Sequence, residues 1–203
     1  MPTIYGMTDS GNCYKPRLLM ALLGRPFRHV ETSSRDGTTR QPSFLAKNAN
    51  GKVPLLELDD GRFVAESNAI LLYLGEGTAF VPADTYERAV VNQWLFFEQY
   101  SHEPHVAVRR SLMLYPERKA LATPERMASL LESGNRALGV MEAQLAKTPF
   151  LAGSEMTVAD IALYAYTHDA SAGGYDLAQF PAVSAWLHRV ADHPGHVPMS
   201  WTP

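Results

Sequence analysis

The spacing of apolar residues changes once along the chain, between residues 76 and 84. Before this point, short β-prone runs at 3–7 and 28–31 alternate with helical stripes, such as the leucine-rich run that ends at Gly24. After it, apolar residues recur at helical spacing with no strand pattern, over 85–114, 124–147, 161–168 and 181–191. The pattern predicts a small open sheet covered by helices, followed by an entirely helical region.

The stretch 51–74 predicts a hairpin followed by a helix. Asp59-Asp60-Gly61 indicates a tight turn, because Asp and Gly tolerate the positive φ that a two-stranded connection needs. One strand enters this turn through Pro54, and the helix begins at Glu66-Ser67. With a short helix over 42–46, the predicted order is β-α-β-α-β-β-α.

The second half of the chain begins after a linker, Val81-Pro82-Ala83-Asp84. We therefore assign residues 1–78 to a first domain and 85–203 to an all-helical second domain. Thr157-Val158-Ala159-Asp160 has the spacing of a capping box, with Asp where Glu or Gln is usual.

Composition narrows the function classes. A chain of 203 residues with a net charge of −3 gives no sign of a nucleic-acid or membrane surface, and no apolar run approaches a membrane span. A single cysteine, Cys13, cannot form an internal disulfide and fits a reducing cytosol. The N-terminus lacks the basic and apolar regions of a signal peptide. We expect a cytoplasmic protein that binds neither nucleic acid nor membrane.

Three patches occur in order and at a characteristic spacing. They are 10–18 (Ser-Gly-Asn-Cys-Tyr-Lys-Pro-Arg-Leu), Lys52-Val53-Pro54 with 66–70, and 150–153 with 157–160. Through these patches the chain resembles the cytosolic glutathione S-transferase family over essentially its whole length. The resemblance implies a thioredoxin-like N-terminal domain, an all-helical C-terminal domain and glutathione as co-substrate. It also implies a transferase acting in detoxification, with no metal, and a homodimer that pairs the first domain of one subunit with the second domain of the other.

The resemblance implies roles for the glutathione-binding residues. A cis bond between Val53 and Pro54 would present the backbone of Val53 to the cysteinyl part of glutathione, although Pro54 alone can simply start a strand. Ser67 and the helix N-terminus would bind the γ-glutamyl carboxylate, and Glu66 the γ-glutamyl ammonium. Ser67 can equally be a plain N-cap. Gln41, Arg40 and Lys52 are candidates for the glycyl carboxylate.

The chemistry is expected in residues 10–13. Ser10 matches the catalytic serine of serine-type members, and Asn12 matches the asparagine of disulfide-reducing bacterial members, which pair it with a threonine. From the residues alone, helix capping is the simpler role for both. Cys13 is expected near the helix start, where a mixed disulfide with glutathione needs the thiol to face the ligand. Pro16 fits the first turn if the helix begins at Asn12 or Cys13.

The second substrate is expected to be a small electrophile, which the sequence does not identify. Candidate lining residues share aromatic, sulfur-containing or basic side chains; they are Met7, Tyr14, Tyr100, His105, Arg109, Met113 and Tyr115. His102 and His105 lie three apart without a third metal ligand, so we interpret both as ordinary surface residues. Two alternatives to conjugation stay open: glutathione-dependent disulfide reduction and a non-catalytic binding or scaffold module.

Overall fold

The computed structural model describes residues 1–203, which fall into two compact units. One unit is Met1–Thr78 together with His193–Pro203, and the other is Ala79–Asp192. The change of unit between Thr78 and Ala79 falls between residues 76 and 84, where the spacing of apolar residues changes. Residues 193–203, which the sequence assigned to the second domain, pack instead with the first unit.

The first unit contains a four-stranded sheet in the order β2-β1-β3-β4. Its strands are β1 (Thr3–Gly6), β2 (Arg28–Glu31), β3 (Leu55–Glu57) and β4 (Phe63–Ala65). β1 and β2 are parallel, whereas β3 is antiparallel to both of its neighbours. The hairpin predicted around Asp59-Asp60-Gly61 joins β3 to β4, and Gly61 has the positive φ of 82° that the turn requires.

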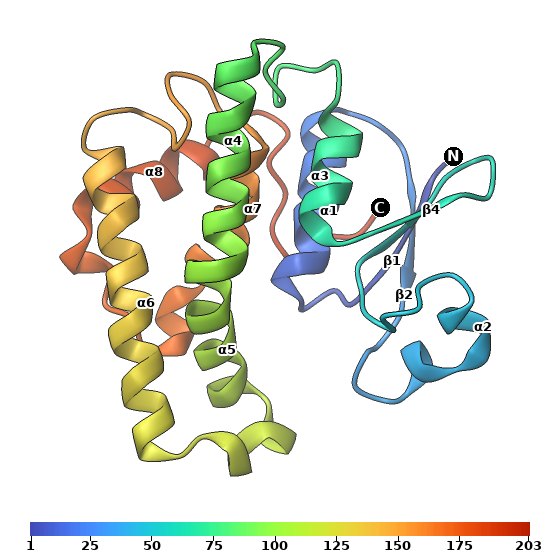
Figure 1. Ribbon diagram of the computed structural model, residues 1–203, viewed down its shortest axis with the longest axis horizontal. Helices are drawn as coiled ribbons and strands as arrows, with labels where there is room; N and C mark the ends of the chain where they lie inside the picture. Colours follow the sequence, from blue (N-terminus) through green and yellow to red (C-terminus); the bar gives the residue numbers. More distant parts are fainter. The chain divides into compact units, whose positions relative to one another are not determined.

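Three helices complete the first unit: α1 (Gly11–Leu22), α2 (Pro42–Leu45) and α3 (Ser67–Gly75). Figure 1 shows α1 and α3 together on one side of the sheet and α2 on the other. The apolar stripes of α1 and α3 meet the sheet, so that Leu18, Leu56 and Ile70 are fully buried. The thioredoxin-like prediction is confirmed, and a short 3₁₀ turn, Thr38–Arg40, lies between β2 and α2.

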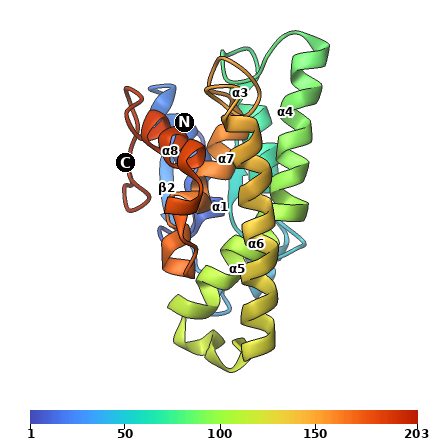
Figure 2. The ribbon, with the colours of Figure 1, turned by 90° about the vertical axis from the view of Figure 1, so that its left-hand side faces the viewer.

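The second unit is helical, as predicted. Its α-helices are α4 (Thr85–Phe97), α5 (Glu103–Leu114), α6 (Pro124–Leu145), α7 (Val158–Thr167) and α8 (Pro181–Ala191). Figure 2 shows α5 and α6 side by side, and the two are in contact. None of the helices has both the length and the apolar character needed to cross a membrane.

The helix predicted over 85–114 is interrupted by a π-helical turn, Glu98–His102. Pro104 has no N–H to donate to the carbonyl four residues earlier, so the regular α-helical ladder cannot continue through this point. The predicted capping box at the start of α7 is present, since Thr157 and Asp160 bond reciprocally to backbone N–H groups. Asp160 is fully buried and also accepts from the Trp186 indole at 3.0 Å.

Candidate functional site

The loop from β1 to α1 ends in Ser10, which caps the helix. Ser10 has extended backbone angles, and its hydroxyl oxygen accepts from the backbone N–H of Cys13 at 3.4 Å. Because a serine hydroxyl has two acceptor lone pairs and one proton, this cap uses a lone pair and not the hydroxyl proton. The first turn of α1 contains no acidic residue, so nothing on the helix offsets the positive end of its dipole.

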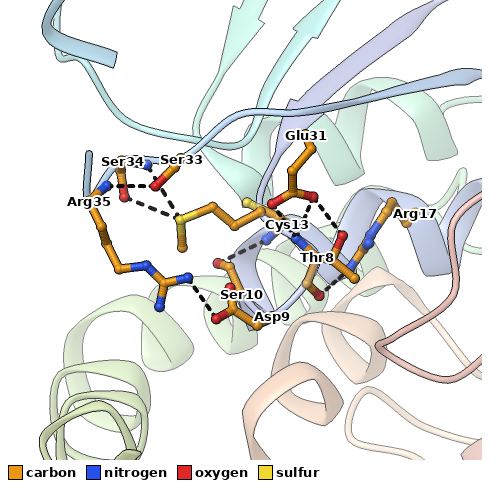
Figure 3. Close-up of polar contacts among 10 residues, drawn as sticks. Thr8, Asp9, Ser10, Cys13, Arg17, Glu31, Ser33, Ser34 and Arg35 are labelled. Carbon is orange, nitrogen blue, oxygen red and sulfur yellow. Dashed lines mark hydrogen bonds and ion pairs between the residues drawn. The ribbon is translucent and has the colours of Figure 1, made fainter. Parts of the chain in front are cut away.

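Cys13 lies behind this loop and faces the sheet (Figure 3). Its side chain has no exposed surface, and a Cβ placed on Gly6 would lie only 2.8 Å from the Cys13 Cβ. Burial raises the pKa of the Cys13 thiol to about 11, although hydrogen bonding to Ser10 opposes the shift. Cys13 is thus a neutral packing residue between α1 and β1, a placement that favours packing over contact with a ligand.

Asn12 and Ser67, which the sequence assigned to two different patches, meet in the structure. The Ser67 hydroxyl donates to Asn12 Oδ1 at 3.1 Å. Lys15 joins them: its ammonium donates to Ser67 Oγ and to Asn68 Oδ1, both at 3.2 Å, and its side chain is fully buried. Sequence reasoning missed Lys15, because a lysine is normally exposed and nothing in the pattern marks this one as buried.

The start of α3 differs from the plain cap that Ser67 alone would provide. Glu66 is the N-cap, with φ 68° and ψ 118°, and no side chain caps the helix. Ser67 is the first helical residue, and its hydroxyl is used by Asn12 and Lys15. The N-cap side chain therefore does not close the start of α3, and a helix N-terminus can bind a carboxylate. The exposed Glu66 carboxylate stands beside this N-terminus and suits a cation.

Val53-Pro54 is a cis peptide bond, as the resemblance implied. Val53 is half-buried, and neither its N–H nor its carbonyl bonds to another backbone group. The preceding loop is fixed by Asn48, whose amide donates to the Lys52 carbonyl at 2.8 Å. A fixed strand end with unused backbone groups can pair with an extended peptide.

The three candidates for the glycyl carboxylate lie between β2 and β3: Arg40 ends the 3₁₀ turn, Gln41 precedes α2, and Lys52 precedes Val53. Arg40, Gln41 and Lys52 are exposed, and Arg40 Nη1 donates to the Asn50 carbonyl at 3.2 Å. All three belong to the first unit. Their roles stay predictions.

Two of the second-substrate candidates, Met7 and Tyr14, are buried in the first unit. The Met7 sulfur accepts from the Ser34 N–H at 3.4 Å. The Tyr14 hydroxyl donates to the Val197 carbonyl at 2.5 Å, so its polar end is committed to an internal contact.

The other five candidates belong to the second unit and do not all gather in one place, although Arg109 Nη1 donates to the Met113 sulfur at 3.2 Å. Tyr100 and His105 line a cavity of about 300 Å³, where burial and the nearby Arg136 charge lower the pKa of His105. Met113 and Tyr115 line a different cavity of about 610 Å³.

Arg109, the fifth of these candidates, is folded onto the backbone. It donates to the carbonyls of Gly173 and Met127. The prediction for His102 was wrong in one respect, since it is not a surface residue. It is fully buried at the π-helical turn, where it contacts the Thr167 hydroxyl at 3.0 Å.

Comparisons with known proteins agree with this architecture. Residues 4–79 match the family model described as glutathione S-transferase, N-terminal domain, and residues 119–189 match glutathione S-transferase, C-terminal domain. The chain is 32% identical over 206 residues to glutathione S-transferase 3 of Zea mays, covering 94% of this chain and 89% of that protein. The chain belongs to the glutathione S-transferase family, whose activity depends on glutathione.

Two further relatives are informative. A crystal structure of a glutathione S-transferase from Pseudomonas fluorescens superposes with a TM-score of 0.94, at 49% identity, and the match covers 98% of both chains. The disulfide-bond oxidoreductase YfcG of Escherichia coli is 28% identical over 194 residues, covering 90% of this chain and 87% of that protein.

Proposed function

We propose that the chain conjugates the thiolate of glutathione to small electrophiles, with Ser10 as the donor to the thiolate. The observation that carries this proposal is the state of the β1–α1 loop. Ser10 caps α1 through its lone pair and keeps its hydroxyl proton, whereas Cys13 is fully buried and offers no thiol of its own. The nucleophile is therefore the thiol of glutathione.

The residues for holding glutathione all lie in the first unit. The uncapped N-terminus of α3 receives the γ-glutamyl carboxylate, and the exposed Glu66 carboxylate receives the γ-glutamyl ammonium. The unused N–H and carbonyl of Val53 pair with the cysteinyl backbone. Arg40, Gln41 and Lys52 are assigned to the glycyl carboxylate.

Ser10 and the start of α1 then favour the thiolate over the thiol. A free thiol has a pKa near 8.5, so a drop of about two units, equivalent to about 2.7 kcal/mol, makes the thiolate the main form at neutral pH. A hydroxyl donor together with the positive helix end supplies this kind of stabilisation. The thiolate attacks the electrophilic carbon, a carbon–sulfur bond forms, and the leaving group departs with the electron pair of the broken bond.

Ser10→Ala tests the assignment directly. We expect glutathione to bind with little change and turnover of an aryl halide to fall about tenfold to a hundredfold at neutral pH, because one donor to the anion is lost. Ser43→Ala, the same chemical change at an exposed position on α2, is the matched control and should behave as the unaltered protein. Unchanged turnover in Ser10→Ala removes Ser10 from this role. Absence of glutathione binding in the unaltered protein, measured by calorimetry, would instead favour a non-catalytic module.

Disulfide reduction is the second candidate, favoured by the similarity to YfcG and by Asn12. In this reaction the glutathione thiolate attacks one sulfur of a glutathione-capped disulfide, oxidised glutathione forms, and the other sulfur leaves as a thiol. We expect aryl-halide conjugation to exceed reduction of a small disulfide by the same protein sample. Robust disulfide turnover with negligible conjugation would reverse the order of the two candidates.

We also propose a homodimer, in which each subunit supplies its first unit to the second unit of the other. The second unit exposes apolar side chains that a partner would cover: Phe96 is 73% exposed, Tyr100 87% and Val140 50%. Phe96→Asp should shift the sedimentation coefficient to that of a monomer. A monomer for the unaltered protein refutes the proposal, as does a Phe96→Asp variant that sediments as a dimer.

A further inference from the structure

Arg17 on α1 connects the β1–α1 loop to the segment 193–203. Its side chain has no exposed surface, and a single nitrogen, Nη2, donates to the Thr8 carbonyl at 2.8 Å and to the Met199 carbonyl at 2.9 Å. Figure 3 shows the guanidinium beside the loop that carries Thr8, Asp9 and Ser10. The same charged group thus holds the loop that ends in the α1 cap and a segment that arrives from the far end of the sequence.

Two more contacts hold the segment 193–203 to the first unit. The Tyr14 hydroxyl donates to the Val197 carbonyl at 2.5 Å, one helical turn from Arg17. The rings of Phe27 and Trp201 meet edge to face, with centroids 6.0 Å apart. The segment is therefore anchored at both sides of the Arg17 contact.

The loop is also held from its other side. The Thr8 N–H donates to both carboxylate oxygens of Glu31, at 3.1 and 3.2 Å, and the Thr8 hydroxyl donates at 2.6 Å. Thr8 is thus bonded through its N–H, hydroxyl and carbonyl, two residues before Ser10. Without the hydrogen bond from Arg17, the Thr8 carbonyl would lose this donor, while the N–H and hydroxyl would stay bonded to Glu31.

The charge of Arg17 is incompletely compensated. Its Nε and Nη1 are buried without a hydrogen-bond partner, and no carboxylate lies within ion-pair distance. Burial lowers the pKa of Arg17, while Cys13, Glu31, Tyr14 and Asp9 are the titratable groups around it that oppose this shift. A buried cation of this kind stabilises an anion placed nearby. Its effect on the loop is visible at Cys13, since Arg17 opposes the rise in the pKa of that thiol.

We propose that Arg17 is a positioning residue with two roles. It clamps the β1–α1 loop to the segment 193–203, and its positive charge stabilises the glutathione thiolate at that loop. The clamp is inferred from the hydrogen bonds of Arg17 alone and does not depend on the proposed function. The charge effect rests on the proposed function, because it needs a glutathione thiolate at the loop.

Four variants separate the two roles. Arg17→Met removes the clamp and the charge, and Arg17→Lys keeps the charge with fewer donors. A chain ending at Pro198 removes the Met199 carbonyl and leaves Arg17 in place. Arg28→Met, at an exposed position of β2, removes the same charge away from the loop and is the matched control.

Amide hydrogen exchange of residues 8–13 in the ligand-free protein tests the clamp. We expect at least tenfold faster exchange in Arg17→Met and in the shortened chain, and no change in Arg28→Met. Protection equal to that of the unaltered protein in both altered chains overturns the clamp. If Arg17→Met does not fold, the exchange rates of residues 8–13 in the shortened chain and in Arg17→Lys are compared with those of the unaltered protein instead.

The pH dependence of kcat/KM for the electrophile, measured at saturating glutathione, tests the charge effect. In Arg17→Met we expect the apparent pKa of the bound thiol to rise by about one unit, which lowers the thiolate fraction at neutral pH by about threefold, with the glutathione dissociation constant changed less than about threefold. Arg17→Lys should restore the pH profile, and the shortened chain should lower kcat without moving it. An unmoved profile in Arg17→Met overturns the charge effect. If the unaltered protein neither binds nor turns over glutathione, the proposed function fails, and the exchange measurement still decides the clamp.

Discussion

Replacing Glu66 by glycine should stabilise the first unit and weaken glutathione binding at the same time. Glu66 has φ 68° and ψ 118°, in the region that side-chain-bearing residues rarely adopt. Such a conformation costs about 1–2 kcal/mol, which glycine avoids because it has no Cβ. Glycine also adds about 0.4–1 kcal/mol of conformational freedom to the unfolded chain. The net gain in the free energy of unfolding is about 0.5–1 kcal/mol, or a rise in Tm of about 1–4 °C.

The same substitution removes the carboxylate assigned to the γ-glutamyl ammonium. Glu66 is exposed and its side chain does not cap α3, so its loss should cost the fold little. A hydrogen bond to a charged group contributes about 1.5–3 kcal/mol, so we expect the glutathione dissociation constant to increase about tenfold to 150-fold. Stability and affinity should therefore move in opposite directions.

Glu66→Ala separates the two effects, because alanine loses the carboxylate and keeps the positive φ. Calorimetric titration should give the same loss of affinity for Glu66→Ala and Glu66→Gly, and thermal unfolding should show the increase in Tm for Glu66→Gly alone. Equal melting temperatures for the two variants would show that the strain relieved at Glu66 is no larger than the entropy that glycine adds to the unfolded chain. Undiminished glutathione binding in both would show that the ammonium binds elsewhere.

Four further substitutions test the packing and the burial of polar groups. On α6, Gly134→Ala should lower the free energy of unfolding in urea by roughly 1–3 kcal/mol, because its Cβ would lie 2.3 Å from the Tyr175 hydroxyl oxygen. Gly139→Ala on the same helix has no neighbour within 4 Å and should raise it by about 0.5–1 kcal/mol, and equal effects would refute the clash. Asp160→Ala leaves four buried donors without this acceptor and should destabilise the chain by roughly 3 kcal/mol in the same assay, whereas a loss under about 1 kcal/mol would contradict the network. Burial raises the pKa of Cys13 from 9.0 to about 11, so the folded chain keeps a proton that the unfolded chain loses. Stability is then complete below pH 9 and falls by up to about 2.7 kcal/mol as the pH rises to about 11. Cys13→Ala should lack this alkaline loss, and an identical pH profile would refute it.

The sequence predicts the architecture well, because hydrophobic periodicity and turn residues act locally. The strand over 28–31, the turn at Asp59-Asp60-Gly61 and the capping box at Thr157 all depend on residues close together in the chain. The π-helical turn at Glu98–His102 was not predicted, although Pro104 marks the position at which a regular helix cannot continue.

What the sequence does not predict depends on contacts between distant segments. Burial of Lys15, Arg17 and His102 follows from packing and contradicts the usual exposure of basic side chains. The segment 193–203 is short and has no periodicity, so nothing in it indicates that it packs with residues near the start of the chain. The burial of these side chains and the packing of this segment can be predicted only when the positions of their partners are known.

Asn12 and Ser67 illustrate why a catalytic role and a binding role cannot be assigned here by single substitutions. The hydrogen bond between them joins the start of α1 to the start of α3, and Lys15 is bonded to Ser67 as well. Removing the Ser67 hydroxyl takes an acceptor from Lys15 and a donor from Asn12 Oδ1. The substitution therefore changes contacts at the start of α1 as well as at the start of α3. A fall in turnover in Ser67→Ala therefore does not by itself establish contact with the γ-glutamyl carboxylate. Only the energy of coupling between the two positions separates the role of each side chain from the bond they share.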